Sequence, residues 1–249
     1  LGCACAPLLV GMMLFSEGQE ANLSFPYMIM GIVVLVVALI FSRVNLPEIV
    51  HAEDATQAET SENKKGVWSN KLFVFGISAL FCYEIAEISI NSFFINYVVD
   101  DGWMNARDAS VVLSFGGLGL FMCGRFAGSW IMRYIKAEKV LFYCAIGTVI
   151  TTATVVLNLG LLSFVGLILI YVFEAIMFPT IFALAIKGVG AHTKQASSYL
   201  IMAIVGGAIA PVLMGLIGEQ QMSLGFIVPL VCFVVIIGYA VRYKKISDL

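Results

Sequence analysis

The amino-acid sequence predicts an all-α, polytopic membrane protein. Of the 249 residues, 61% are hydrophobic and only 12% are charged, whereas a soluble domain has about 45–50% apolar and about 25% charged residues. The apolar residues form long continuous runs, which are typical of membrane helices and not of the alternating strands of a β-barrel. Because lipid admits only helices or closed barrels, we interpret these runs as helices.

Eight apolar runs follow one another along the chain. They cover approximately residues 1–15, 25–42, 72–98, 110–135, 140–159, 163–187, 196–217 and 225–243. Most have the length of a spanning helix, but the first begins at Leu1 without a Met or a basic leader and is shorter than the roughly 20 residues required. We therefore expect the first run to be the second half of a helix and the chain to be a fragment of a longer protein.

Lys and Arg lie almost entirely on one side of the predicted segments. If consecutive segments cross in alternate directions, all of the 14 Lys and Arg residues except Arg107 lie on the same side. Cytoplasmic loops carry the excess of basic residues, so the C-terminus and the polar loop 43–71 are predicted to be cytoplasmic. The protein is then a multi-pass protein of the inner (cytoplasmic) membrane.

Three carboxylates lie near the middle of membrane-length apolar segments. They are Glu84, Glu87 and Glu174. An ionised group in hydrocarbon is costly, so such residues face a bundle interior or a wet cavity and mark a substrate or ion path. Glu84, Glu87 and Asn91 follow the three- and four-residue steps that share one helical face. The central positions predict a site near the bilayer midplane, where carriers hold their substrate.

Several other function classes find little support in the sequence. The net charge of −2 and the few basic residues argue against a nucleic-acid partner. No nucleotide motif occurs, the six Cys lack zinc spacing, and the two His have no partners at ligand spacing, so no cofactor or metal is predicted. An intramembrane enzyme and a channel stay as the least favoured alternatives, because no His or Asp lies in a span and no filter string occurs.

Several strings resemble the major facilitator superfamily and, within it, the fucose–galactose–glucose:H⁺ symporters. They are Pro26–Tyr27, FCYEIAEISINSFFINY at 81–97, GRFAGS at 124–129, IMFPTIFALAIK at 176–187 and GGAIAPVLMG at 206–215. The resemblance covers essentially the whole chain. It implies that residues 1–42 are a truncated helix 5 and helix 6, the end of the N-terminal bundle. Residues 43–71 would be the cytoplasmic central loop and residues 72–249 the C-terminal six-helix bundle, helices 7–12.

The resemblance implies secondary active transport by alternating access. The implied substrate is a hexose or deoxyhexose of the fucose, glucose and galactose class, carried in symport with protons. The implied partners are a small-molecule sugar, protons, the lipid bilayer and the missing N-terminal half of the same protein, which holds acidic residues tied to proton coupling. A Na⁺-coupled or non-sugar carrier of the superfamily stays as the alternative. Asn91, Glu174 and Phe178 depart from the family's pattern and leave the particular sugar open.

A sugar site needs fixed carboxylates or amides and an aromatic wall. Glu87 can accept hydroxyl hydrogen bonds, and Asn91, one turn further on, supplies a donor and an acceptor. Phe94 and Phe178 are expected to form the apolar wall, and Glu84 is a weaker contact candidate. A structural bond to a neighbouring helix and proton handling stay as alternatives for Glu87.

Two further residues are candidates for the transport cycle. Glu174 precedes Pro179 by five residues, and a carboxyl group near a broken helix could carry a proton or bind a hydroxyl. Arg125 is expected near a cytoplasmic loop, where it would form a gating contact or reach water as a topology anchor.

Small residues and a proline also suggest a hinge. Gly206, Gly207 and Pro211 lie close together in one predicted span. They would let the helix bend during transport, and the alternative is that they serve only helix packing.

Overall fold

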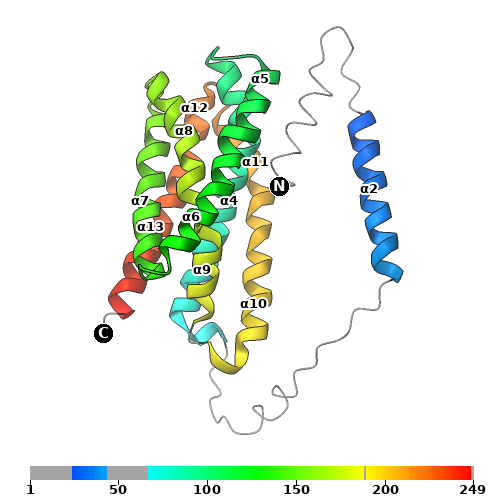
Figure 1. Ribbon diagram of the computed structural model, residues 1–249. Helices are drawn as coiled ribbons and strands as arrows, with labels where there is room; N and C mark the ends of the chain where they lie inside the picture. Colours follow the sequence, from blue (N-terminus) through cyan, green and yellow to red (C-terminus); the bar gives the residue numbers. More distant parts are fainter. Residues whose placement is uncertain (1–23, 44–66, 188, 248–249) are drawn as a thin grey trace.

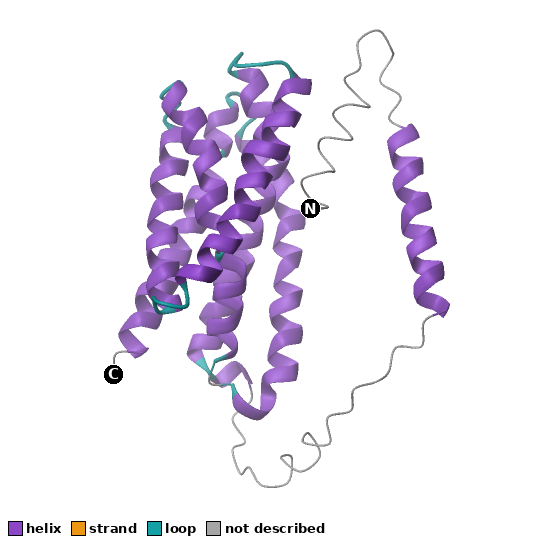
Figure 2. Ribbon diagram, viewed as in Figure 1, coloured by secondary structure: helices purple, strands orange, loops and turns teal. Residues whose placement is uncertain are grey.

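The described part of the chain contains a bundle of six long apolar helical segments. The computed structural model describes residues 24–43, 67–187 and 189–247 (Figure 1). Helices form all the regular structure of these residues, and Figure 2 shows no strand among them. The segments long and apolar enough to cross a membrane are Lys71–Asp100, Ala106–Ile131, Ala137–Val156, Leu161–Ile186, Thr193–Ile217 and Met222–Tyr243.

The six segments confirm the predicted all-α membrane fold, and several are built from shorter elements. The elements in the first three are α4 (Lys71–Asp100), then α5 (Ala106–Val111), the π-helix η2 (Val112–Leu118) and α6 (Gly119–Ile131), then α7 (Ala137–Val156). The last three contain α8 (Leu161–Glu174) and α9 (Met177–Ile186), then α10 (Thr193–Met202), η4 (Ala203–Val205) and α11 (Gly206–Ile217), then α12 (Met222–Gly225) and α13 (Ile227–Ser247). Two short 3₁₀ turns lie outside the segments, η1 (Val67–Ser69) and η3 (Gly190–His192).

The expected N-terminal segments are only partly described. Helix α2 (Ser24–Arg43) matches the expected run 25–42. It lies apart from the bundle in Figure 1, and its side chains from Met28 onward are exposed. The expected half-helix at 1–15 and most of the predicted loop 43–71 lie outside the described residues.

Helix α4 is the central helix of the bundle. It packs along α13 and α11 and also against α9. Its side chains include several of the largest fully buried ones, among them Tyr83, Phe94 and Tyr97. Asn70 caps its start by accepting the N–H of Leu72 at 3.0 Å, which satisfies one of the free amides of the first turn. The buried side chains of α4 therefore lie among the other helices of the bundle.

The second segment begins and ends earlier than the apolar pattern predicted. The sequence suggested 110–135, but the helix runs from Ala106 to Ile131. Asn105 caps the start, because its side-chain oxygen accepts the N–H of Asp108 at 2.8 Å. Because Asn105 caps the helix, the polar residues after it form the first helical turn. A search for apolar residues leaves these polar residues out of the segment.

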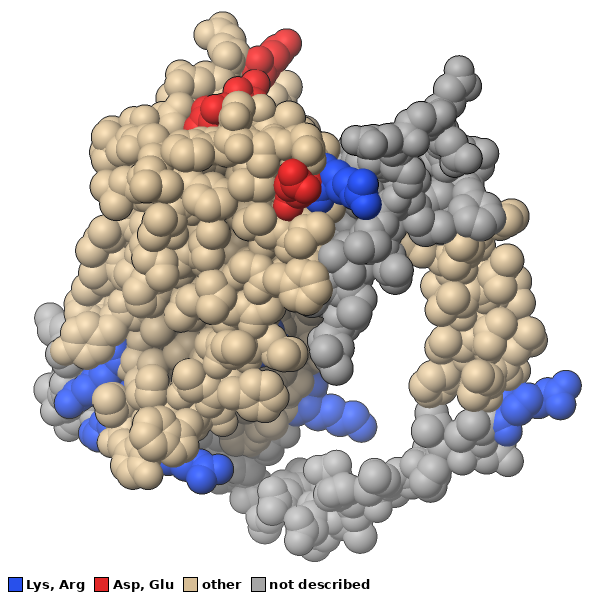
Figure 3. Space-filling model, turned by 45° about the horizontal axis from the view of Figure 1, so that its top comes forward, with Lys and Arg blue, Asp and Glu red and all other residues tan. Residues whose placement is uncertain are grey.

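Charged side chains separate toward the two ends of the bundle. Figure 3 shows Asp and Glu gathered toward one end and most Lys and Arg toward the other. Asp100 and Asp101 lie at the end of α4, whereas Arg133 and Lys139 flank the turn between α6 and α7 at the opposite end. This distribution matches the charge asymmetry of the sequence.

Candidate functional site

A break in the fourth long segment organises the candidate site. Helix α8 ends at Glu174 and α9 begins at Met177, with a turn at residues 175–176. Pro179 follows one turn later and has no N–H to donate to the carbonyl of Ala175, four residues earlier. The break therefore exposes backbone carbonyls in the middle of a membrane-length segment.

Glu174 lies at this break and is fully buried, with an exposed fraction of 0%. Neither oxygen of its carboxyl group has a hydrogen-bond partner among the described residues. Its backbone carbonyl accepts a hydrogen bond from the Tyr83 hydroxyl of α4 at 3.3 Å. A buried ionised carboxylate without a hydrogen bond is costly. The Glu174 carboxyl therefore requires either a proton or a donor from outside these residues.

The two glutamates of α4 differ in burial and in their neighbours. Glu87 is half-buried, and its carboxylate is close enough to Glu174 and to the Tyr83 hydroxyl to interact with both. Glu84 is buried, with 7% of its surface exposed. The expected grouping of Glu87 with Glu174 on different helices is thus present in the structure.

Asn91 continues the same face of α4, one turn beyond Glu87. The residue is half-buried, and its side-chain oxygen has no hydrogen-bond partner in the part of the chain that the structure describes. An unpaired buried acceptor costs about 1–3 kcal/mol. Asn91 therefore offers an acceptor that a hydroxyl group would satisfy.

The two expected wall residues have different positions. Phe178 is half-buried, with its ring centre 6.0 Å from that of Tyr83 and 6.2 Å from that of Phe182. Phe94 is fully buried and packs edge-on against Tyr171, with ring centres 6.0 Å apart. Phe178 can therefore face a ligand, whereas Phe94 supports the site from the core and does not line it.

Arg125 is an exposed residue of α6, about one and a half turns before the end of that helix. Its Nε donates to the carbonyl oxygen of Ala175 at the break, at 3.1 Å. The guanidinium lies 4.7 Å from the ring centre of Phe121 and within electrostatic range of Glu87. The predicted gating contact of Arg125 at a cytoplasmic loop stays a prediction.

Two tyrosines complete the cluster, and the sequence analysis did not single them out. Tyr83 and Tyr171 are fully buried. The hydroxyl of Tyr171 has no partner among the described residues, and the ring lies near the Glu87 and Glu174 carboxylates. Tyr83 precedes Glu87 by four residues and Tyr171 precedes Glu174 by three. This helical spacing was the available signal for both.

The proposed hinge residues lie where α11 approaches α4 closely. A Cβ on Gly206 would lie 2.7 Å from the carbonyl oxygen of Phe81, and one on Gly207 would lie 2.8 Å from Ile88. The preceding turn, η4, is a 3₁₀-helix, and Pro211 lies inside α11. Close packing therefore accounts for both glycines, and the hinge remains a proposal that rests on the irregular turn and Pro211.

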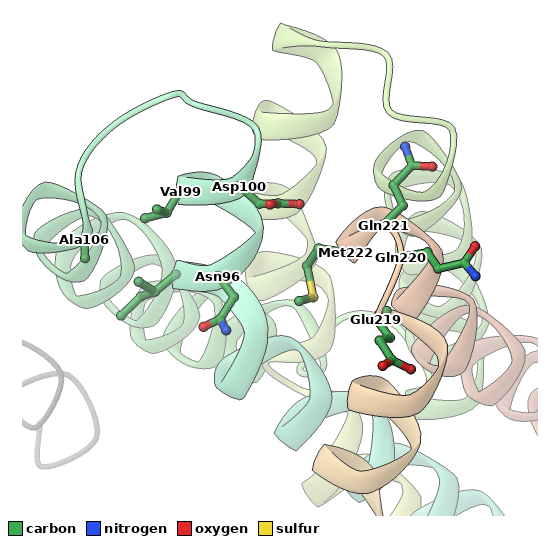
Figure 4. A pocket seen from close by; sticks show the side chains of 10 residues that line it. Asn96, Val99, Asp100, Ala106, Glu219, Gln220, Gln221 and Met222 are labelled. Atoms are coloured by element: carbon green, nitrogen blue, oxygen red, sulfur yellow. The ribbon is translucent and has the colours of Figure 1, made fainter.

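A separate pocket opens at the acidic end of the bundle. It has a volume of about 450 Å³ and lies between the end of α4 and the loop after α11 (Figure 4). Its polar lining consists of carboxylates and amides, namely Asn96, Asp100, Glu219, Gln220 and Gln221. Its lining on α4 begins at Ile95, which lies one turn, or about 6 Å, beyond Asn91 and about 12 Å beyond Glu87. The pocket therefore lies next along α4 from Asn91, toward the acidic end of the bundle.

The described residues contain no group of three or more His, Cys, Asp and Glu side chains that could hold a metal ion. The cluster at the break instead combines two carboxyl groups, two tyrosine hydroxyls and an amide beside a phenylalanine ring. Such groups can bind hydroxyl groups and exchange protons.

The fold and this site define a membrane carrier of known type. Residues 1–211 match the family model described as "Major Facilitator Superfamily". The chain therefore belongs to the major facilitator superfamily, whose members are transporters and not enzymes.

The similar proteins agree with the narrower resemblance seen in the sequence. The chain is 34% identical to a protein of Brucella abortus named "Glucose/galactose transporter", covering 98% of this chain and 61% of the relative. It is 31% identical to the "L-fucose-proton symporter" of Escherichia coli, covering 93% of this chain and 53% of that protein. These matches confirm the resemblance to the fucose–galactose–glucose:H⁺ symporters. The chain spans about half to three-fifths of their length.

Solved structures show the same fold. A crystal structure of the transporter FucP in the outward conformation matches with a TM-score of 0.67 and 28% identity. The match covers 88% of this chain and 54% of FucP. A second crystal structure, of a single-residue variant of the Escherichia coli fucose:proton symporter FucP, matches with a TM-score of 0.68 and 26% identity.

Proposed function

We propose that this chain is part of a secondary active sugar transporter that carries a hexose or deoxyhexose together with protons. The observation that carries the proposal is the cluster of Glu87, Glu174, Tyr83 and Phe178 beside the broken helix, with Glu174 and Tyr83 fully buried and Glu87 and Phe178 half-buried. The names of the relatives support sugar as the substrate class, and the name of the fucose relatives supports protons as the coupling ion.

The chemistry of the cluster suits a sugar. Glu87 and Asn91 would accept hydrogen bonds from sugar hydroxyl groups, and hydrogen bonds to charged groups are the stronger kind. The half-buried ring of Phe178 would lie against the apolar face of the sugar ring. Glu84 lies one turn from Glu87 toward the basic end, so it would contact the sugar less. Glu174 would take up a proton on one side of the membrane and release it on the other.

The proposed domain organisation follows the resemblance. Residues 72–249 would form helices 7–12, and residues 1–42 would belong to the N-terminal bundle, with the loop 43–71 between them. The basic end of the bundle would face the cytoplasm across the inner membrane, because Lys and Arg accumulate on cytoplasmic loops. Membrane-impermeant thiol labelling tests this orientation. A Cys placed at Glu219 in a Cys-free background should react from outside, and a Cys placed at Lys194 should not.

Uptake by the complete carrier in proteoliposomes tests the function. L-fucose, D-galactose and D-glucose should be compared as labelled substrates. We expect uptake of at least one sugar to rise as the external pH falls and to collapse with a protonophore. If uptake follows a Na⁺ gradient and is insensitive to the protonophore, the coupling ion is Na⁺ and not the proton. If none of these sugars is transported, a non-sugar carrier is favoured.

A further inference from the structure

The segment formed by α8 and α9 contains a backbone carbonyl that its own helix cannot satisfy. In a regular helix the N–H of residue 179 would donate to the carbonyl of residue 175. Residue 179 is Pro179, which has no N–H, so Ala175 lacks this donor. An unpaired carbonyl within a membrane protein is costly, so a donor from another element would stabilise the break.

Arg125 on α6 supplies that donor. Its Nε donates to the carbonyl oxygen of Ala175 at 3.1 Å. The glycines on either side of Arg125 allow the close approach of α6. A Cβ on Gly124 would lie 2.9 Å from the Cβ of Ala175, and a Cβ on Gly128 would overlap the side chain of Ile176. The string GRFAGS therefore brings the guanidinium directly against the break.

The contact lies between two side chains of the candidate site. Glu174 directly precedes Ala175, and Phe178 follows it by three residues. The Tyr83 hydroxyl holds the adjacent carbonyl, that of Glu174, from α4 at 3.3 Å. Donors from α4 and α6 thus hold two consecutive carbonyls at the break.

We propose that Arg125 is a positioning residue of the sugar site: its Nε replaces the amide that Pro179 lacks and thereby orients Glu174 and Phe178. The inference rests on the proposed sugar transport, but the hydrogen bond to Ala175 does not. Lys cannot replace Arg in this role, because a flexible ammonium lacks the planar, directional N–H groups of a guanidinium.

A substitution that returns the missing amide tests the proposal. Pro179→Ala restores an N–H four residues after Ala175 and so removes the need for Arg125. In the complete carrier, we expect Arg125→Gln to weaken sugar binding about tenfold, or about 1.4 kcal/mol. Adding Pro179→Ala to Arg125→Gln should recover most of that affinity, and Arg125→Lys should bind almost as weakly as Arg125→Gln. Calorimetry with L-fucose, D-galactose and D-glucose measures these affinities.

Arg133→Gln is the matched control. Arg133 is an exposed basic residue two positions after the end of α6, so its substitution changes the charge equally but leaves the break intact. It should bind sugar like the parent. Three results would overturn the positioning role: Arg125→Gln binding like the parent, Arg125→Lys binding like the parent, or no recovery on adding Pro179→Ala. The last would indicate that the guanidinium contacts the sugar itself.

Thermal unfolding without sugar separates this proposal from the proposed function. Arg125→Gln should lower the Tm of the complete carrier, and Pro179→Ala should recover it. Suppose that the parent binds none of the three sugars although the Tm values follow this pattern. That result would confirm that Arg125 replaces the missing amide of Pro179 and would contradict the proposed sugar transport. If the parent binds sugar but neither Tm nor affinity responds to Pro179→Ala, the positioning role fails and the sugar function stands.

Discussion

At the scale of single residues, the site is defined by polar groups that are buried without complete hydrogen bonding. The carboxyl of Glu174, the side-chain oxygen of Asn91 and the hydroxyl of Tyr171 lack partners within the described residues. Seven described residues have such groups. Because buried polar groups are normally hydrogen-bonded, the three that lie near the break on α4 and α8 support a functional site there. Glu87, beside these residues, is half-buried and is the carboxylate best placed to meet a ligand.

Glu87→Gln should weaken sugar binding without loss of folding. The substitution keeps the size and one acceptor but removes the charge, and hydrogen bonds to charged groups are worth about 1.5–3 kcal/mol. Since each 1.4 kcal/mol is tenfold in affinity, we expect binding to the complete carrier to weaken roughly ten- to a hundredfold. Calorimetry on the purified variants measures the change.

Glu84→Gln is the matched control for this prediction. It removes the same charge one turn away on the same helix, from a side chain that is 7% exposed. Its effect on affinity should be smaller. If Glu84→Gln weakens binding while Glu87→Gln binds as tightly as the parent, the sugar-contacting carboxylate is Glu84.

Glu174→Gln should separate sugar exchange from proton-driven accumulation. The amide can still hydrogen-bond but cannot carry a proton, so exchange of labelled for unlabelled sugar should persist. One pH unit corresponds to about 1.4 kcal/mol and can drive up to about tenfold accumulation for one proton per sugar. The parent should approach this value in proteoliposomes, and the variant should only equilibrate. Undiminished accumulation by Glu174→Gln would assign the proton to another group.

At the scale of helices, irregular segments lie beside the candidate site. The break between α8 and α9 exposes the carbonyls of Glu174 and Ala175, which Tyr83 and Arg125 satisfy. The π-helix η2 packs beside α8, and a Cβ on its Gly117 would lie 3.0 Å from the Tyr171 ring. π-Helical segments often occur at functional sites. The regular helices build the bundle, and the irregular segments lie beside the polar side chains of the candidate site.

Glycines of α11 provide a test of the packing at this scale. The Cβ of Gly206→Ala would meet the Phe81 carbonyl oxygen at 2.7 Å, a backbone atom that cannot move aside easily. Overpacking of this kind typically costs about 1–3 kcal/mol. Gly215→Ala is the control on the same helix, because nothing lies within 4 Å of its added Cβ. Thermal unfolding should show destabilisation by Gly206→Ala only, and equal Tm values would contradict the close approach of α11 to α4.

The sequence predicted the helices better than the contacts between them. Continuous apolar runs fix the number and approximate position of the membrane segments, because length and hydropathy are local properties. The sharing of one face by Glu84, Glu87 and Asn91 also follows from local spacing. The pairing of Arg125 with Ala175 joins residues 50 positions apart in the chain. No local pattern of the sequence reveals such a pairing.

At the scale of the whole molecule, the chain combines a charge gradient with a central polar site. Acidic groups lie toward one end and basic groups toward the other (Figure 3), and the cluster at the break lies between them. The pocket lined by Asn96 and Glu219 opens at the acidic end, which would face outward in the proposed orientation. A sugar entering from outside would pass this end of α4 before it reached Asn91 and Glu87.

A structure of the complete carrier with a bound sugar tests the central claim most directly. We predict that the sugar lies beside the α8–α9 break, with a hydroxyl group within hydrogen-bond distance of Glu87 and its ring against Phe178. The Nε of Arg125 should still donate to the Ala175 carbonyl. A sugar that contacts neither Glu87 nor Phe178, for example one held only in the pocket between α4 and residues 218–222, would contradict the account.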